Sequence, residues 1–250
     1  MKNFRPVSNL PYLVKLIERV VDQRFDQHLK VNNLYEKMQS SYRKFHSTES
    51  ALVCVHNDLC MSVDQSGAAI LVLLDLSAAF DTIDHSLLLS LLEEKMGITG
   101  GALAWIKSYL SDRGQCVIID GSTSKKMTLL YGVPQGSVLG PKLYVRYVKP
   151  IGDIIRKYKL HFHMYADDTQ VYVFFHVNNT KEAIRKLESC VEEIRTWMKN
   201  NLLKLNDDKT ELINISTPSQ LAKLPDISLK MGDSSVEHKN SVKNIGAIFD

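Results

Sequence analysis

The sequence predicts an α+β fold, because segments typical of strands alternate with segments typical of helices and one pair of strands forms a hairpin. Residues 69–76 are a continuous apolar run rich in branched side chains, which is typical of a strand buried on both faces. Residues 161–175 are apolar on both sides of a polar turn at 166–168, which predicts an antiparallel hairpin. Residues 181–201 carry apolar side chains at spacings of three and four, which favours a helix that covers the sheet over a coiled coil.

Two helices are expected before the buried strand. The first spans 13–25 and the second spans 48–61, where Ser47 is placed to cap the N-terminus. The first helix is amphipathic, because its apolar residues share one face: Leu13, Leu16, Ile17, Val20 and Val21.

The middle of the chain is expected to contain two short helices, a ribbon of two strands around a Gly121–Ser122 turn, a loop rich in glycine and proline, and a further helix. In chain order, these segments are 86–96, 102–110, 115–119, 126–131, 132–141 and 143–157.

The composition fits a globular protein: 44% of the 250 residues are hydrophobic and 24% are charged, with a net charge of +3. The four cysteines include no CxxC pair, which excludes a zinc ribbon and a disulfide scaffold. The chain opens without an apolar export signal, and its longest apolar stretch is far shorter than the roughly 20 residues that cross a bilayer. We therefore expect an intracellular protein, nuclear or cytoplasmic, with no membrane partner.

Three aspartates stand where a carboxylate is costly. Asp75 ends the apolar strand, and Asp167 and Asp168 form the tip of the hairpin. Each has an ordinary explanation on its own, since aspartate is common in helix caps and turns. If the two strands are neighbours, however, the carboxylates meet at one edge of a sheet and repel each other unless cations neutralise them. All-oxygen ligands select Mg²⁺ or Mn²⁺, and two such ions can activate a hydroxyl group and stabilise a pyrophosphate leaving group.

These aspartates lie within motifs that occur in a recognisable order. Residues 74–81 (LDLSAAFD), 132–137 (GVPQGS) and 165–168 (YADD) resemble the signature motifs of reverse transcriptases from non-LTR (LINE-type) retrotransposons. Two preceding and two following segments resemble further motifs of that family, so the similarity extends from residue 4 to residue 249. These segments are 4–8 (FRPVS), 42–48 (YRKFHST), 205–211 (LNDDKTE) and 242–246 (VKNIG).

The resemblance implies the fingers and palm of a right-hand polymerase, truncated before the thumb. Residues 1–66, with 98–131 contributing, would form the fingers, and 67–250 would form the palm, including the loop 132–141 and the hairpin 162–175. The implied activity is RNA-directed DNA synthesis, with an RNA template, a DNA primer and deoxynucleoside triphosphates as partners. The alternative is a catalytically inactive remnant that only binds nucleic acid or a protein partner.

The resemblance also implies roles for single residues. Asp75, Asp167 and Asp168 would be catalytic and would bind two Mg²⁺ or Mn²⁺ ions, together with the main-chain carbonyl of Leu76. Five residues would contact the nucleotide, with Phe80 excluding a ribose 2′-hydroxyl and Lys209 near the pyrophosphate: Arg43, Phe80, Gln135, Gly136 and Lys209. Phe80 could instead be a core aromatic, and Lys209 could be a solvated lysine beside two aspartates. Arg5, Lys243 and Gly246 would contact nucleic acid.

The chain departs from the family pattern at two places. Phe45 stands where relatives commonly carry glycine, and its ring is expected to crowd the loop that positions Arg43. Lys142, Arg146 and Lys149 stand where relatives continue with apolar residues, and a charge on the inner face of that helix would be costly unless it reached solvent. Both departures are compatible with harmless variation or with a decaying element.

Overall fold

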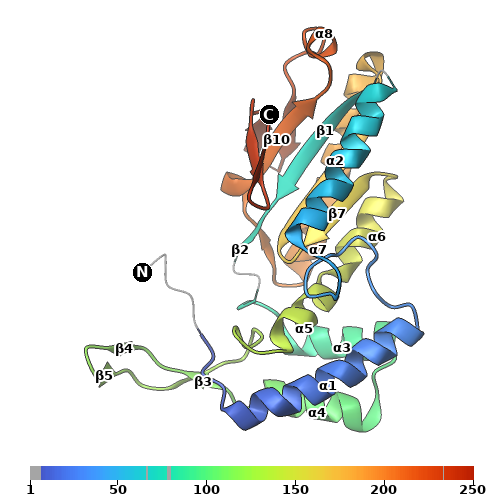
Figure 1. Ribbon diagram of the computed structural model, residues 1–250. Coiled ribbons are helices and arrows are strands. Elements are labelled where there is room, and N and C mark those ends of the chain that lie inside the picture. Colours follow the sequence, from blue (N-terminus) through green and yellow to red (C-terminus); the bar gives the residue numbers. More distant parts are fainter. Residues whose placement is uncertain (1–6, 66, 78–79, 233) are drawn as a thin grey trace. The chain divides into compact units, whose positions relative to one another are not determined.

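The computed structural model describes residues 7–65, 67–77, 80–232 and 234–250 (Figure 1). The chain forms two compact units, each assembled from two stretches of sequence. Unit 1 combines Met1–Tyr35 with Ala78–Tyr147, and unit 2 combines Glu36–Ser77 with Val148–Asp250. Helices and strands alternate along the chain and the main sheet is antiparallel, so the predicted α+β class is confirmed. No helix in the described part of the chain is long and apolar enough to cross a membrane.

The centre of unit 2 is a four-stranded antiparallel sheet in the order β10-β1-β8-β7. Its strands are β1 (Ala68–Leu74), β7 (His161–Tyr165), β8 (Asp168–Phe175) and β10 (Glu211–Ile215). Six of the seven β1 residues are buried, which confirms the strand expected from its apolar run. The predicted hairpin is confirmed as β7 and β8, whose register pairs Tyr165 with Asp168.

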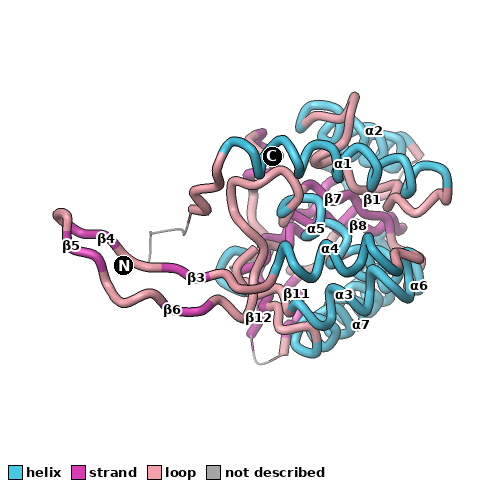
Figure 2. The backbone as a smooth tube through the Cα atoms, turned by 90° about the horizontal axis from the view of Figure 1, so that it is seen from below, coloured by secondary structure: helices cyan, strands magenta, loops and turns pink. Residues whose placement is uncertain are grey.

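Three helices of unit 2 pack on this sheet: α2 (Thr48–Asp64), α6 (Lys149–Lys157) and α7 (Thr180–Asn200). The sheet lies between α2 and α7 in both views (Figures 1 and 2). Ser47 caps α2 as predicted, since its hydroxyl accepts the Ser50 N–H and the Ser50 hydroxyl accepts the Ser47 N–H. The apolar stripe of α7 is buried at Leu187, Val191 and Ile194, which confirms that this helix covers a sheet.

Smaller elements complete unit 2. Three two-stranded sheets pair β2 with β9, β11 with β12, and β13 with β14. Their bounds are β2 (Leu76–Ser77), β9 (Lys204–Leu205), β11 (Ser228–Met231), β12 (Ser234–Glu237), β13 (Val242–Asn244) and β14 (Ala247–Phe249). The remaining short helices are η1 (Val177–Asn179), η2 (Asp207–Lys209) and α8 (Pro218–Leu221).

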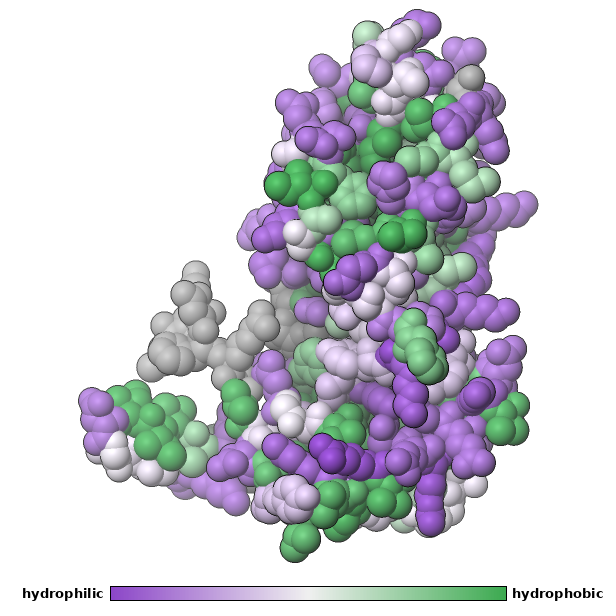
Figure 3. All heavy atoms as spheres, in the orientation of Figure 1, coloured by the Kyte–Doolittle hydropathy of each residue, from purple (hydrophilic) through white to green (hydrophobic). Residues whose placement is uncertain are grey.

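Unit 1 contains four helices and a ribbon of short strands. The helices are α1 (Tyr12–Val31), α3 (His85–Met96), α4 (Gly100–Leu110) and α5 (Gly140–Tyr147). The strands are β3 (Gly114–Gln115), β4 (Ile118–Ile119), β5 (Ser122–Thr123) and β6 (Met127–Thr128). Figure 2 shows the ribbon extending from the helices of this unit, and Figure 3 shows apolar side chains on it, where Val117, Ile118 and Ile119 are exposed. Ile119 pairs with Ser122, so the turn is Asp120–Gly121, one residue earlier than predicted.

The apolar face of the amphipathic helix α1 is not its buried face. Four of its five apolar residues are exposed, namely Leu13, Leu16, Ile17 and Val20. Glu18 is fully buried instead, and its carboxylate accepts hydrogen bonds from the Tyr109 hydroxyl and from the Val138 N–H at 2.9 Å. Phe25 and Leu29 lie on the same buried face. Helical periodicity located the helix, but it could not show that Glu18 is buried by its hydrogen bonds to Tyr109 and Val138.

The single helix predicted over 143–157 is also wrong. The structure has α5 and α6, which are separated by Val148. Pro150 lies in the first turn of α6. Inside a continuous helix, its ring would clash with the carbonyl group four residues earlier and remove a hydrogen bond. The proline therefore explains why the helix stops and restarts.

The unexpected charges near α5 are accommodated by partners within unit 1. The Lys142 ammonium lies 2.6 Å from the Asp22 carboxylate and 2.8 Å from the Asp26 carboxylate. Arg146 is buried, and its guanidinium lies 4.6 Å from the centre of the Tyr35 ring. A buried charge is tolerable when it is paired, so these residues do not prevent folding.

Candidate active site

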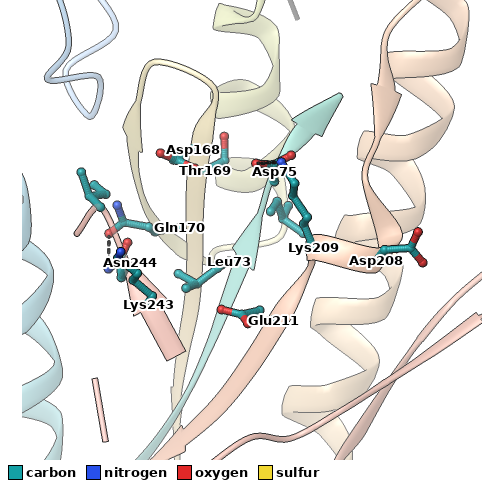
Figure 4. Close-up of a pocket in the computed structure, with 12 residues that line it drawn as sticks. Leu73, Asp75, Asp168, Thr169, Gln170, Asp208, Lys209, Glu211, Lys243 and Asn244 are labelled. Carbon is teal, nitrogen blue, oxygen red and sulfur yellow. Dashed lines mark hydrogen bonds and ion pairs between the residues drawn. The ribbon is translucent and has the colours of Figure 1, made fainter. Parts of the chain in front are cut away.

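The sheet register brings Asp75 beside Asp168. The last residue of β1, Leu74, pairs with Thr169 of β8. Asp75 follows Leu74 and Asp168 precedes Thr169, so both residues lie at the same end of neighbouring antiparallel strands (Figure 4). The condition set by the sequence, that the two strands lie side by side, is therefore met.

The carboxylates at this end of the sheet interact electrostatically. Burial and the negative charges of Asp167 and Asp75 together raise the pKa of Asp168 to about 6, whereas Lys209 opposes the shift. The Lys209 ammonium lies 3.5 Å from a carboxylate oxygen of Asp75. Asn206 also donates to Asp75, through its N–H to the main-chain carbonyl at 2.9 Å. The site thus concentrates negative charge and compensates it only in part.

Asp75, Asp168 and Lys209 line a cavity of about 310 Å³ in unit 2 (Figure 4). Its charged lining mixes four carboxylates with two ammonium groups, from Asp75, Asp168, Asp208, Glu211, Lys209 and Lys243. Such a cavity suits a ligand that carries both negative phosphate groups and polar sugar hydroxyls, because cations can bind the former and carboxylates can accept hydrogen bonds from the latter.

The donor set fits a divalent cation in chemistry. Carboxylate oxygens are the ligands that Mg²⁺ and Mn²⁺ prefer, and a bound cation would reverse the repulsion that raises the pKa of Asp168. Among residues 7–65, 67–77, 80–232 and 234–250, no three His, Cys, Asp or Glu side chains are grouped closely enough to hold a metal ion. The assignment of Asp75, Leu76, Asp167 and Asp168 as metal ligands therefore stays a prediction.

The turn that carries Asp167 is held by a segment that the sequence did not single out. Ala166 has a left-handed backbone conformation (φ +55°), and its N–H donates to the Ser41 hydroxyl at 2.9 Å and to the Gln39 side-chain carbonyl at 3.2 Å. Gln39 and Ser41 are both buried. The only signal in the sequence was the presence of these two polar residues next to the 42–48 motif, and contacts between segments more than a hundred residues apart cannot be inferred from local pattern.

Arg43 lies in the same segment as Gln39 and Ser41 and is half-buried. Its Nη1 donates to the main-chain carbonyls of Glu36 at 3.2 Å and of Gln39 at 3.0 Å, so the guanidinium stabilises its own loop. Phe45 has φ +63°, a conformation that favours glycine, and its ring is fully exposed. The expectation that this ring crowds the loop is therefore wrong, and the departure from glycine affects the backbone instead.

The other predicted nucleic-acid contacts of unit 2 lie on the β13–β14 hairpin. Lys243 lines the cavity, and Gly246 has φ +93° in the tight turn that joins the two strands. A side chain at Gly246 would be strained in this conformation, which explains the glycine without reference to a ligand. Arg5 lies outside the described residues.

The remaining candidates belong to unit 1. The centre of the Phe80 ring lies 4.7 Å from that of Tyr144, and Phe80 is half-buried. In the glycine-rich loop, the Gln135 carbonyl accepts the Ser8 N–H at 2.9 Å and Gly136 has φ +92°. The Ser137 hydroxyl donates to the Pro134 carbonyl and accepts the Gly140 N–H, which fixes the shape of the loop.

Comparison with known proteins identifies the family. Residues 1–249 match the reverse transcriptase (RNA-dependent DNA polymerase) family, and this chain belongs to it. It is 28% identical to the RNA-directed DNA polymerase from mobile element jockey of Drosophila melanogaster, a match that covers 99% of this chain and 27% of that protein. It is 29% identical to the probable RNA-directed DNA polymerase from transposon BS of the same organism, over 84% of this chain and 23% of that protein. The resemblance to non-LTR retrotransposon enzymes is confirmed, and the chain spans about a quarter of the length of these relatives.

Solved structures show the same fold at low sequence identity. Apo telomerase from Candida tropicalis, truncated from its C-terminal domain, aligns with a TM-score of 0.56 and 14% identity, over 88% of this chain and 43% of that one. Telomerase from Candida albicans in complex with a fragment of telomeric RNA aligns with a TM-score of 0.55 and 14% identity, over 92% of this chain and 38% of that one. These matches support a polymerase fold.

Proposed function

We propose that this chain is the catalytic region of a retrotransposon RNA-directed DNA polymerase, which adds deoxynucleotides to the 3′-hydroxyl of a DNA primer on an RNA template. One observation carries the proposal: Asp75 and Asp168 lie at the same end of neighbouring strands and line one cavity with Lys209 and Lys243. Carboxylates for a divalent cation beside ammonium groups for phosphates are what nucleotidyl transfer requires.

Asp75, Asp167, Asp168 and the Leu76 carbonyl would hold two Mg²⁺ or Mn²⁺ ions. When bound, these ions supply the positive charge that activates the primer hydroxyl and stabilises the departing pyrophosphate. Lys209 adds positive charge on the same side, because its ammonium already lies beside Asp75. With a cation held at Asp75, Lys209 would be free to bind a phosphate group instead.

The other assignments follow from motif position. Arg43 would bind the triphosphate and Phe80 would exclude a ribose 2′-hydroxyl, while Gln135 and Gly136 would contact the nucleotide and its template base. Lys243 and Gly246 would contact the primer, and Arg5 would contact nucleic acid. The proposed fingers (1–66 with 98–131) and palm (67–250) are defined by these functional roles. Their boundaries differ from those of the two compact units, 1–35 with 78–147 and 36–77 with 148–250.

The test is primer extension by the purified chain on an RNA template with a labelled DNA primer, deoxynucleotides and Mg²⁺ or Mn²⁺. We expect extension by the parent chain and its loss in Asp167→Ala. Asp226→Asn, which changes an exposed aspartate of the same unit, should extend as the parent does. An Asp167→Ala variant that extends as well as the parent would remove the proposed site.

A second candidate is an inactive remnant that only binds nucleic acid. The observation in its favour is the segment 36–45, where Arg43 donates to main-chain carbonyls and Phe45 has a strained backbone conformation. In the same experiment, a remnant would bind the labelled template–primer by fluorescence anisotropy and would extend nothing with either metal.

A further inference from the structure

Two buried side-chain amides face each other beside the proposed active site. Gln170 of β8 is 1% exposed and Asn244 of β13 is 2% exposed. The Asn244 amide nitrogen donates to the Gln170 side-chain carbonyl at 3.2 Å, and both residues line the cavity of Asp75 and Asp168 (Figure 4). Because burying an amide is costly without a hydrogen bond, this pair depends on the mutual contact.

The hydrogen bond connects two elements that share no strand pairing. β8 belongs to the four-stranded sheet, whereas in the described part of the chain β13 pairs only with β14. The three residues of β13 alternate: Val242 is buried in the core, Lys243 is exposed, and Asn244 is buried. Since Val242 and Asn244 both point inward, they fix the direction in which Lys243 points outward.

At its other end, the hydrogen bond reaches the strand of the proposed catalytic carboxylate. Gln170 follows Asp168 by two residues on β8, so both side chains project from the same face, about 6.6 Å apart along the strand. Asn244 immediately precedes the turn of the 242–249 hairpin. The bond therefore ties the turn of this hairpin to the strand that carries Asp168.

The contribution of this pair to the free energy of folding does not by itself explain its presence. The second polar atom of the Gln170 amide, its nitrogen, is buried and has no hydrogen-bond partner among the described residues. An unsatisfied buried donor costs free energy that an apolar side chain of similar size would not. A pair that is costly in this way and joins two functional elements points to a role in their placement.

We propose that Gln170 and Asn244 are positioning residues for primer extension, which hold the 242–249 hairpin and its Lys243 in place beside Asp168. The inference rests on the proposed function, because the hairpin matters for the reaction only if it contacts the primer. The pair acts through Lys243 and through the backbone of the hairpin turn.

The test compares Gln170→Met, Asn244→Leu and the exchanged double variant Gln170→Asn/Asn244→Gln, whose summed side-chain length is conserved. Each single variant should raise the KM for template–primer about tenfold, as expected from the loss of one buried hydrogen bond, and should change kcat less than twofold. Hydrogen exchange at 243–247 should accelerate in the single variants, because the hairpin loses its hydrogen bond to β8. The exchanged variant should recover most of the parent KM.

Gln220→Met is the matched control, because it removes a side-chain amide that bonds to Ser216 at 2.7 Å in the same unit. It should leave both the KM and the exchange of the hairpin unchanged. Unchanged hairpin exchange and KM in Gln170→Met would overturn the inference, while extension by the parent would leave the proposed function standing. If the parent chain itself extends no primer, the proposed function fails and the role in positioning fails with it, even where the hairpin exchange still responds.

Discussion

Replacing Glu18 tests how α1 is oriented in unit 1. Glu18 is fully buried, and its two carboxylate oxygens accept the Tyr109 hydroxyl and the Val138 N–H. Burial and the hydrogen bond to Glu18 both raise the pKa of Tyr109, so the hydroxyl remains a donor throughout the physiological range. Glu18→Leu leaves both donors without an acceptor, and Glu18→Gln retains one acceptor of the two.

The magnitude follows from these two donors. A buried donor that loses its acceptor costs about 1–3 kcal/mol. Tyr109 and Val138 are half-buried, which places each in the lower part of that range. Glu18→Leu should therefore lower the unfolding free energy by about 2–3 kcal/mol, and Glu18→Gln by about 1 kcal/mol.

The assay is urea unfolding followed by circular dichroism and by tryptophan fluorescence. Trp105 is a local probe, because its ring stacks on Tyr109 at 5.5 Å. Tyr109→Phe supplies the double-mutant cycle with Glu18→Gln, and the pair should show coupling because the two side chains are in direct contact.

The reciprocal substitutions distinguish the observed orientation of α1 from the one that its apolar pattern predicts. Ile17→Gln and Val20→Gln change exposed residues and should each alter stability by less than about 0.5 kcal/mol. If the apolar face were buried instead, each would cost several times more. A Glu18→Leu chain as stable as the parent, together with a destabilised Ile17→Gln, would refute the reasoning.

Two further predictions concern strain and charge. Phe45→Gly should raise the unfolding free energy by about 1 kcal/mol, because the left-handed backbone at φ +63° costs a non-glycine residue about 1–2 kcal/mol. The control Phe45→Ala removes the exposed ring without that gain. Equal unfolding midpoints in urea for the two variants would contradict the explanation. Lys142→Met should cost about 2 kcal/mol at pH 7, because it leaves the carboxylates of Asp22 and Asp26 without their cation. Burial raises the pKa of Asp22 and Lys142 opposes that shift. The loss of unfolding free energy in Lys142→Met should therefore shrink towards pH 4, where the folded variant binds a proton at Asp22. A loss that stays constant with pH would show that Asp22 is not the group responsible.

The sequence was sufficient where one segment determines its own structure. The apolar run at β1, the cap at Ser47 and the stripe of α7 all follow from local pattern, and all are present. The strand pairing that brings Asp75 and Asp168 together was stated only as a condition, because register between segments about 90 residues apart depends on the whole sheet. The break at Val148 was readable from Pro150, which the apolar periodicity of 143–157 outweighed.

The residues that sequence reasoning missed share a physical cause. Glu18 binds the N–H of Val138 in the glycine-rich loop, Ser41 binds the N–H of Ala166 in the YADD turn, and Gln170 binds the Asn244 amide next to the turn of the 242–249 hairpin. Each loop has backbone or amide groups that a regular element would satisfy internally, and a loop must satisfy them elsewhere. The partner is a buried polar side chain outside the loop that it holds, and in α1 and β8 this side chain breaks the apolar pattern of its own element. An interpretation from periodicity places such a polar residue on the solvent-facing side of its element. In this protein, the residue is buried and binds a loop or turn that needs a hydrogen-bond partner.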